Sequence, residues 1–236
     1  MGTGWSRVLR AVERIRPRQT WVASAGLGLI GIDDQVPSYA ATFQTGHLDS
    51  IPGETQAWWI ALSGQGWWKK LIGKGLTIVQ LSECYLRALE PGLISLSRAI
   101  PERMLIISPG LAGKPSPLAS CILPIDVRIE HLVSTTRGDT GPAALGWLAE
   151  TCLATSGMSI KHLREICRQT MEAQPPLRQW HRERLDDSQV IDFIRNERAQ
   201  SSTRVSASSV LRRIRDAGFA CEQSRLSKLY EKTFGL

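Results

Sequence analysis

The sequence predicts an α/β fold: a three-layer body with a mainly parallel sheet, followed by a helical C-terminal region with a helix-turn-helix-like pair. Short apolar runs alternate with helical stretches, which is typical of βαβ units. After about residue 141 the pattern is wholly helical. The chain has 236 residues, of which 42% are hydrophobic and 22% charged, enough for one large core and a small appendage.

The body is predicted to begin with an amphipathic helix from Trp5 to Arg16, which ends at Pro17. A buried strand that opens into a glycine-rich loop follows at residues 20–32. Further helices are expected at residues 54–62, 67–72 and 83–97, the last interrupted by Pro91 and Gly92. Further buried strands are expected at residues 76–81, 103–108 and 120–126.

The C-terminal region is predicted to contain helices only, at residues 143–154, 159–173, 188–198, 208–217 and 222–234. Pro175 and Pro176 break the pattern, and a Ser- and Thr-rich linker begins near residue 200. We therefore expect three parts: an α/β body over residues 1–157, a helical extension over 158–200 and a helix-turn-helix-like module over 201–236.

The net charge of +7 is concentrated at the two ends of the chain. Residues 1–18 hold five Arg and one Glu, and residues 161–236 hold fifteen basic and ten acidic residues. The segment between them is slightly acidic. Basic ends on a near-neutral body suggest contact with a polyanion, most simply nucleic acid. A solvated charged surface is the alternative.

The last two helices carry the predicted nucleic-acid interface. An apolar stripe of Val210, Leu211 and Ile214 marks the first helix, Ser206 or Ser208 can cap its start, and Gly218 fits a left-handed position after its end. In a helix-turn-helix the second helix offers side chains to bases while nearby arginines reach phosphates. The predicted nucleic-acid-binding residues are Arg212, Arg213, Arg215, Gln223, Ser224, Arg225 and Lys228. The rival interpretation is a helical hairpin packed on the body, with solvated arginines.

A glycine-rich turn after the first strand suggests a ligand pocket, because glycines let the backbone approach a ligand closely. The predicted pocket residues are Ser24, Gly26, Gly28, Tyr39 and, after the third strand, Ser108. The spacing fits neither G-x-G-x-x-G nor a phosphate-binding P-loop.

The irregular segment of residues 33–50 contains the candidates for catalysis. His47 and Asp49 could do acid–base work there. Alternatively, Tyr39 and Phe43 fold this loop against the body, and its polar groups satisfy the backbone. No nucleophile accompanies the histidine, so the sequence leaves open whether the protein is an enzyme.

Two tryptophan pairs, Trp58-Trp59 and Trp67-Trp68, lie near three lysines, Lys69, Lys70 and Lys74. Adjacent helical residues point about 100° apart, so one indole of each pair can be buried while the other lies at the edge. Exposed indoles beside lysines would stack on bases. Core or subunit-interface packing is the more common role of such residues.

The sequence gives no sign of a metal site, a cofactor or a membrane span. Its five cysteines (Cys84, Cys121, Cys152, Cys167 and Cys221) and its four histidines are scattered singly. No apolar run approaches the ~18 residues of a membrane helix, and the N-terminal segment lacks the apolar core of a secretory signal. We expect a cytoplasmic protein with reduced thiols.

The string VASAGLGLIGIDDQVPSYAATF resembles the signature of a group of YaaA-like and archaeosine-synthase-associated domains, whose architecture is similar to that of uracil-DNA glycosylases. The similarity runs from Ser24 to Tyr39 and, more loosely, through LSECYLRAL and LIISPG. It implies an α/β fold and a context of DNA modification or phage defence. Members of this group usually begin with a strand and a cysteine- or serine-bearing loop, whereas only a helix precedes Trp21 here. The resemblance therefore allows a non-catalytic subunit.

These observations support three functional hypotheses. The first is a nucleic-acid-associated subunit of a DNA-modification or phage-defence system, which binds DNA in preference to RNA through its basic ends. The second is an enzyme that acts on a nucleobase or nucleoside, glycosylase- or transglycosylase-like. The third is a non-catalytic assembly module. A protein partner or a homo-oligomer is also expected.

Overall fold

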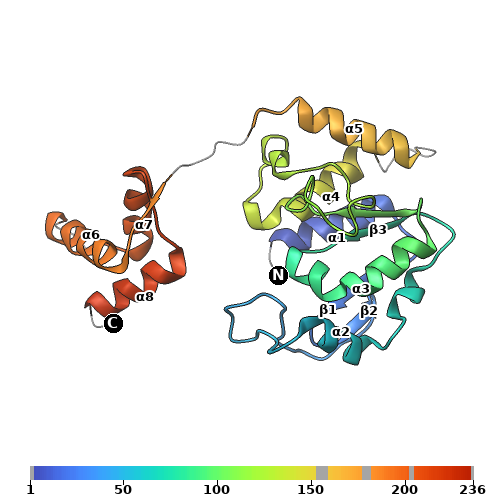
Figure 1. Cartoon of the computed structure of the whole chain (residues 1–236), viewed down its shortest axis with the longest axis horizontal. Helices are drawn as coiled ribbons and strands as arrows, with labels where there is room; N and C mark the ends of the chain where they lie inside the picture. Colours follow the sequence, from blue (N-terminus) through green and yellow to red (C-terminus); the bar gives the residue numbers. More distant parts are fainter. Residues whose placement is uncertain (1–2, 153–158, 177–181, 202–204, 235–236) are drawn as a thin grey trace. The chain divides into compact units, whose positions relative to one another are not determined.

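A computed structural model describes residues 3–152, 159–176, 182–201 and 205–234, and shows a mixed α/β protein (Figure 1). The chain divides into two compact units, Met1–Leu177 and Arg178–Leu236, here called the N-terminal and C-terminal units. Sequence analysis placed the boundaries at residues 157 and 200. The structure instead groups the helix after residue 159 with the N-terminal unit and the helix after residue 186 with the C-terminal unit.

The described part of the N-terminal unit combines helices with two small sheets. Its helices are α1 (Thr3–Ile15), α2 (Thr55–Ser63), α3 (Glu83–Ala99), α4 (Thr140–Thr151) and α5 (Ile160–Glu172). Its strands are β1 (Trp21–Ser24), β2 (Gly28–Gly31), β3 (Thr77–Gln80) and β4 (Met104–Ile107). The short 3-10 helices are η1 (Trp67–Leu71), η2 (Val127–His131) and η3 (Arg137–Asp139).

Strands β3 and β4 form the predicted parallel pair, with Thr77 opposite Met104 and Gln80 opposite Ile107. On its other edge β4 meets the segment predicted as a fourth strand. There the Ile106 amide donates to the Cys121 carbonyl at 2.9 Å, and the Leu123 amide donates to the Ile106 carbonyl at 2.9 Å. This contact is a single parallel bridge rather than a full strand.

Both faces of β4 are buried. Met104 and Ile106 belong to a core cluster with residues of α2 and α3, whereas Leu105 and Ile107 belong to a second cluster with residues of α1, α4 and α5. All four side chains are at most 1% exposed. Alternation of side chains along a strand therefore divides this run between two cores.

The first predicted strand does not join the parallel sheet. Residues 21–31 form an antiparallel hairpin in which Trp21 pairs with Gly31 and Ser24 pairs with Gly28. Gly28 has a φ of +78°, a left-handed conformation that favours glycine and lets the chain reverse. The apolar run was therefore correctly predicted as strand, but its reversal within the run was not.

Helix α3 continues through Pro91 and Gly92, where sequence analysis predicted an interruption. Proline has no N–H to donate to the carbonyl four residues earlier. That carbonyl, on Arg87, instead accepts a hydrogen bond from the Gln56 side-chain amide at 3.0 Å. A Cβ on Gly92 would lie 2.5 Å from Cζ2 of Trp67, so glycine here makes room for the indole.

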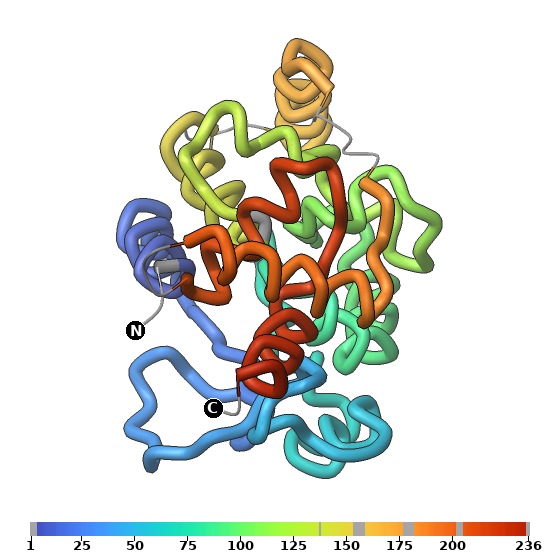
Figure 2. The backbone as a smooth tube through the Cα atoms, turned by 90° about the vertical axis from the view of Figure 1, so that its left-hand side faces the viewer, coloured from blue at the N-terminus to red at the C-terminus, as the bar shows by residue number. Residues whose placement is uncertain are grey.

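Helices α1 and α4 lie side by side in the N-terminal unit, as the blue and yellow helices of Figures 1 and 2 show. Ala11 of α1 is buried in the same cluster as Ala144 and Leu148 of α4. This packing fixes the amphipathic helix that the N-terminal sequence predicts, with its apolar side on the core.

The described residues of the C-terminal unit form three helices and one pair of two-residue strands. The helices are α6 (Asp187–Gln200), α7 (Ala207–Asp216) and α8 (Gln223–Phe234), and the strands are β5 (Glu183–Arg184) and β6 (Phe219–Ala220). Val210, Ile214 and Leu226 are among the described residues of its own core cluster.

The predicted ends of α7 are confirmed. The Ser206 hydroxyl accepts a hydrogen bond from the Ser209 amide at 3.2 Å, and Gly218 has a φ of +87° just past the helix. Six residues, rather than the expected four, separate α7 from α8. Two of these six residues form strand β6, which pairs with β5.

Separate cores predict separate unfolding. Ile214→Ala, at a fully buried position of the C-terminal unit, should lower the free energy of unfolding of that unit by about 2–5 kcal/mol. Leu105→Ala should do the same to the N-terminal unit. In differential scanning calorimetry we expect each variant to lower a different transition. One transition that shifts equally in both variants would show that the two cores unfold together.

Candidate functional site

The predicted pocket residues of the hairpin lie together, but their polar groups bond to one another. The buried Ser24 hydroxyl accepts hydrogen bonds from the Leu27 amide at 3.0 Å and the Gly26 amide at 3.3 Å. It donates to the Tyr39 hydroxyl at 2.6 Å. Ser24 thus closes the turn and holds the following loop, which accounts for its polar group without a ligand.

The side chain of Tyr39 occupies the space beside the turn. A Cβ placed on Gly26 would lie 2.6 Å from Cδ2 of Tyr39, and one placed on Gly28 would lie 2.7 Å from the Ser63 hydroxyl. Both glycines therefore allow close packing within the protein. The close backbone approach that the sequence predicted is present, but here its partners are Tyr39 and α2.

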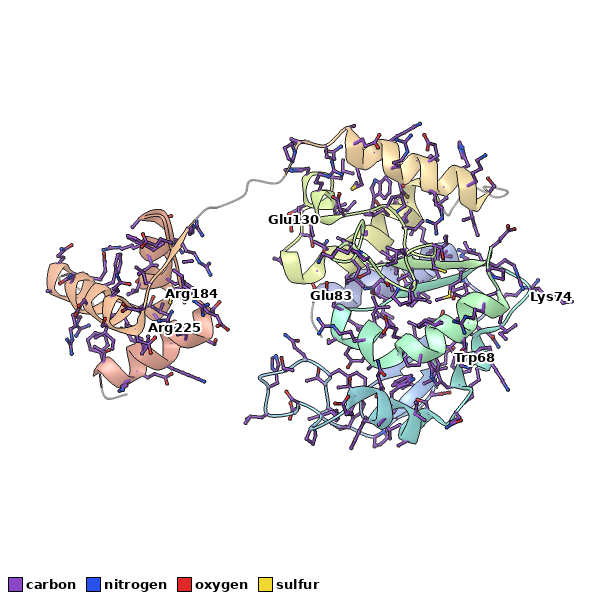
Figure 3. The ribbon with its side chains drawn as sticks, viewed as in Figure 1. Trp68, Lys74, Glu83, Glu130, Arg184 and Arg225 are labelled. Carbon is purple, nitrogen blue, oxygen red and sulfur yellow. The ribbon has the colours of Figure 1, made fainter. Side chains whose placement is uncertain are left out.

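Ser108 lies in a different segment from the other four pocket residues. It is buried just after β4, and its carbonyl accepts hydrogen bonds from the Leu111 and Ala112 amides at 2.9 and 3.2 Å. The predicted position, at the carboxyl end of a parallel strand, is correct. There Gly110 faces Glu83, whose carboxylate makes ion pairs with Arg87 and Lys114 (Figure 3).

His47 and Asp49 are exposed on the loop of residues 33–50. Their backbones hold the loop: the His47 amide donates to the Ser50 hydroxyl at 3.0 Å, and the Asp49 carbonyl accepts from the Thr42 amide at 2.9 Å. Within the described part of the chain, neither the imidazole nor the Asp49 carboxylate has a hydrogen-bonding side chain that would orient it for acid–base work.

Sequence analysis missed Tyr85, which α3 places against this loop. Its ring packs edge-on against Phe43, with centroids 4.9 Å apart. Burial raises the pKa of Tyr85 above its usual range, and a hydrogen bond with the Thr42 side chain opposes that shift. Its place shortly after β3, at the carboxyl end of a parallel strand, was a signal that could have identified it.

The tryptophan pairs divide as helical geometry predicts. Trp59 and Trp67 are buried in the core with ring centroids 5.4 Å apart, whereas Trp58 is exposed and donates from its indole to the Ala25 carbonyl at 2.8 Å. Trp68 is partly exposed, with the Lys69 ammonium 5.9 Å from its ring centroid. Figure 3 shows Trp68 and Lys74 at one edge of the unit.

In the C-terminal unit, two of the predicted contact residues hold the helices together. Arg213 of α7 forms an ion pair with Glu197 of α6. Arg225 of α8 donates to the Asp187 carboxylate at 2.7 Å and to the Leu185 carbonyl at 2.8 Å, close to β5 (Figure 3). A third residue, Ser224, donates to the Glu222 carboxylate at 2.9 Å.

Four other predicted residues point to solvent. Arg212 and Arg215 of α7 and Gln223 and Lys228 of α8 are exposed. Among the residues that the structure describes, these four side chains form neither an ion pair nor a hydrogen bond. They remain available for a ligand on helices whose arrangement is fixed by Arg213 and Arg225.

The described residues contain no group of three His, Cys, Asp or Glu side chains that could hold a metal ion. In those same residues no helix is both long and apolar enough to span a membrane. Comparison of the whole chain with protein-family models, with curated proteins and with solved structures gives no match.

The packing of Tyr39 on Gly26 predicts that a methyl group at position 26 is costly. Gly26→Ala should destabilise the N-terminal unit by about 1–3 kcal/mol, because the Tyr39 ring must move. Gly75→Ala is the matched control, since no atom lies within 4 Å of a Cβ there. Chemical denaturation measures both variants. Equal stability of the two would contradict the packing assigned to Tyr39.

Proposed function

We propose that this protein is a cytoplasmic nucleic-acid-binding subunit of a DNA-modification or phage-defence system, and that its C-terminal unit contacts DNA in preference to RNA. The observation that carries the proposal is the division of the cationic side chains of this unit. Arg213 and Arg225 pair internally, whereas Arg212, Arg215 and Lys228 remain exposed without a partner in the described residues.

The division supports binding, because a polyanion is best bound by cationic side chains that have no internal ion pair and that project from helices in a fixed arrangement. The C-terminal unit holds twelve basic and eight acidic residues, a net charge of +4. In the proposed helix-turn-helix arrangement, Gln223 and Lys228 on α8 face base edges, and Arg212 and Arg215 on α7 reach phosphates. Ser224, at the start of α8, also faces the bases in this arrangement.

The proposed context comes from the resemblance of residues 24–39 to YaaA-like and archaeosine-synthase-associated domains. In keeping with that resemblance, we propose that the N-terminal unit is a reduced three-layer body. The division of β4 side chains between two core clusters supports this proposal. A reaction on a base is less well supported, because Tyr39 occupies the space beside Gly26 and both His47 and Asp49 are exposed.

The proposal predicts that Arg212→Ala/Arg215→Ala weakens DNA binding of the full chain at low salt. Loss of two phosphate contacts should reduce the slope of log K against log salt by about 1.8 for duplex DNA. Fluorescence anisotropy of labelled duplex and single-stranded oligonucleotides measures both quantities. The variant should keep its unfolding temperature, because both side chains are exposed.

The matched control is Arg184→Ala/Lys232→Ala, which removes the same charge from exposed positions on β5 and near the end of α8 that form no ion pair among the described residues. We expect it to retain the wild-type salt slope. If the wild-type chain does not bind, or if both variants lose the same amount, the interface assigned to α7 and α8 is wrong.

An assembly role is a second candidate function, favoured by the apolar surface of α2. Trp58, Ile60 and Leu62 are each more than a third exposed, although this helix has apolar residues around most of its circumference. Helices of this kind are usually buried. A second copy of the chain could cover this surface, which would make the protein a homo-oligomer.

Self-association through α2 predicts that Leu62→Lys lowers the molar mass measured by analytical ultracentrifugation. The control is Leu132→Lys, because Leu132 is similarly exposed but follows η2 instead. A wild-type chain that is monomeric across the concentration range would exclude a homo-oligomer.

A further inference from the structure

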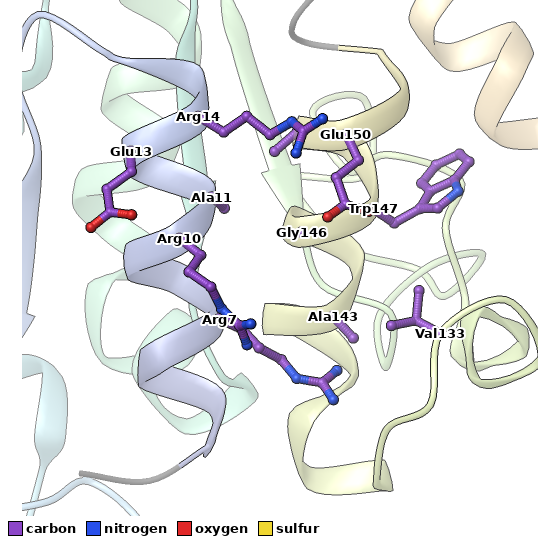
Figure 4. Close-up of a pocket in the computed structure, with 11 residues that line it drawn as sticks. Arg7, Arg10, Ala11, Glu13, Arg14, Val133, Ala143, Gly146, Trp147 and Glu150 are labelled. Carbon is purple, nitrogen blue, oxygen red and sulfur yellow. The ribbon is translucent and has the colours of Figure 1, made fainter.

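A groove with a volume of about 540 Å³ lies between α1 and α4 (Figure 4). Three arginines of α1 line it: Arg7, Arg10 and Arg14. Figure 4 shows Arg7, Arg10 and Arg14 projecting from α1 toward α4, and two acidic residues, Glu13 and Glu150, also line the groove. The small residues Ala143 and Gly146 of α4 also line the groove.

The packing of α1 fixes the backbone positions of the three arginines. Ala11, between them on the helix, is only 3% exposed and packs in the same core cluster as residues of α4. Arg7 donates to the Ser134 carbonyl at 2.6 Å. The basic N-terminal segment is therefore not a free tail, and its guanidinium groups line a preformed surface.

These arginines have few internal partners. The second terminal nitrogen of Arg7 is buried and has no hydrogen-bond partner among the residues that the structure describes. Among the described side chains, Arg10 and Arg14 form no ion pair, although Glu150 lies across the groove. A buried donor without a partner is costly, and an anion in the groove would satisfy it.

The spacing of the three arginines along α1 suits a ligand that carries a row of negative charges. Residues 7, 10 and 14 recur at intervals of three and four on one face of the helix and span about 10 Å along its axis. A nucleic-acid strand in a duplex has one phosphate per about 3.4 Å of axis, so three phosphates fit this length. One guanidinium group can bind two oxygens of the same phosphate at once.

We infer that the groove between α1 and α4 binds the phosphodiester backbone of nucleic acid, as a second contact beyond that of the C-terminal unit. This inference rests on the proposed function and assigns a part of it to the N-terminal unit. Trp147 is also a lining residue, but its indole projects from α4 on the side away from α1 (Figure 4) and packs against the core cluster there. A single phosphate would use one or two of the arginines, whereas a strand uses all three.

The test compares four full-length proteins by anisotropy with labelled single-stranded and duplex DNA from about 50 to about 300 mM salt. They are the wild type, Arg10→Ala/Arg14→Ala in the groove, Arg212→Ala/Arg215→Ala in the C-terminal unit, and the combination of all four substitutions. The groove variant should lose about 1.4 from the salt slope on single strands and about 1.8 on duplex DNA.

The matched control is Arg16→Ala/Arg18→Ala, which removes two exposed arginines of the same segment that do not line the groove. It should keep the wild-type slope. Arg10→Lys/Arg14→Lys should keep most of the salt slope as well, because it preserves the charge. It should lower the affinity, because a lysine ammonium cannot bind two phosphate oxygens in the bidentate way of a guanidinium group. Unfolding temperatures confirm that each variant is folded.

The outcomes separate the two ideas. If the groove variant binds like the wild type while the C-terminal variant loses affinity, the groove inference is wrong and the proposed function stands. If only the groove variant loses affinity, the interface on α7 and α8 is wrong and the groove stands. A wild-type chain that does not bind nucleic acid would overturn both.

Competition distinguishes the ligand class. Pyrophosphate should displace the oligonucleotide only weakly, because it occupies part of the groove. Polyglutamate at equal charge concentration should also compete weakly. Displacement by pyrophosphate at micromolar concentration would identify a small-phosphate site, and equal competition by polyglutamate would identify a site for acidic protein segments. Either result would overturn the inference.

Discussion

The N-terminal unit depends on one constraint: strand β4 has no side that faces water. Its backbone is hydrogen-bonded to β3 on one edge and to the segment around Ile122 on the other. Its alternate side chains enter two different core clusters. A sheet this small is not stable by itself, so helices must cover both of its faces. This requirement brings α3 to one side and α4, with α1, to the other.

The covering helix α3 shows how neighbours allow a locally unfavourable sequence. Pro91 and Gly92 are poor residues for a helix interior, and each by itself argues for a break. In the folded unit, Gln56 bonds to the carbonyl that Pro91 leaves free, and Trp67 fills the space beside Gly92. Both compensating residues come from elements that lie earlier in the chain. The packing of α2 and η1 on α3 thus keeps this helix continuous.

This dependence explains what could be predicted from the sequence. Helices, the strands β3 and β4, the Ser206 cap and the left-handed Gly218 follow from local patterns, and all are present. Strand pairing is not local: the run at residues 20–32 reads equally well as one buried strand or as a tight hairpin. The packing of Tyr39 on Gly26 and of α1 on α4 likewise arises between segments that are separated in the chain, so local patterns do not predict it.

The same limit applies to the charged residues. The sequence shows how many arginines a segment contains, whereas the fold decides which of them form ion pairs. Sequence analysis treated Arg212, Arg213, Arg215 and Arg225 as one group. The fold assigns two of them to hold α6 against α7 and α8, and leaves two exposed. Only the second pair can exchange water and counterions for a phosphate without breaking an existing ion pair.

A similar division occurs on α1, where Arg7 anchors to the Ser134 carbonyl while Arg10 and Arg14 remain unpaired within the described residues. In both units, then, one set of arginines fixes the helices and another is held ready by them. Packing fixes the backbone positions of the second set, whereas their side chains keep their rotamer freedom, which a bound ligand would restrict.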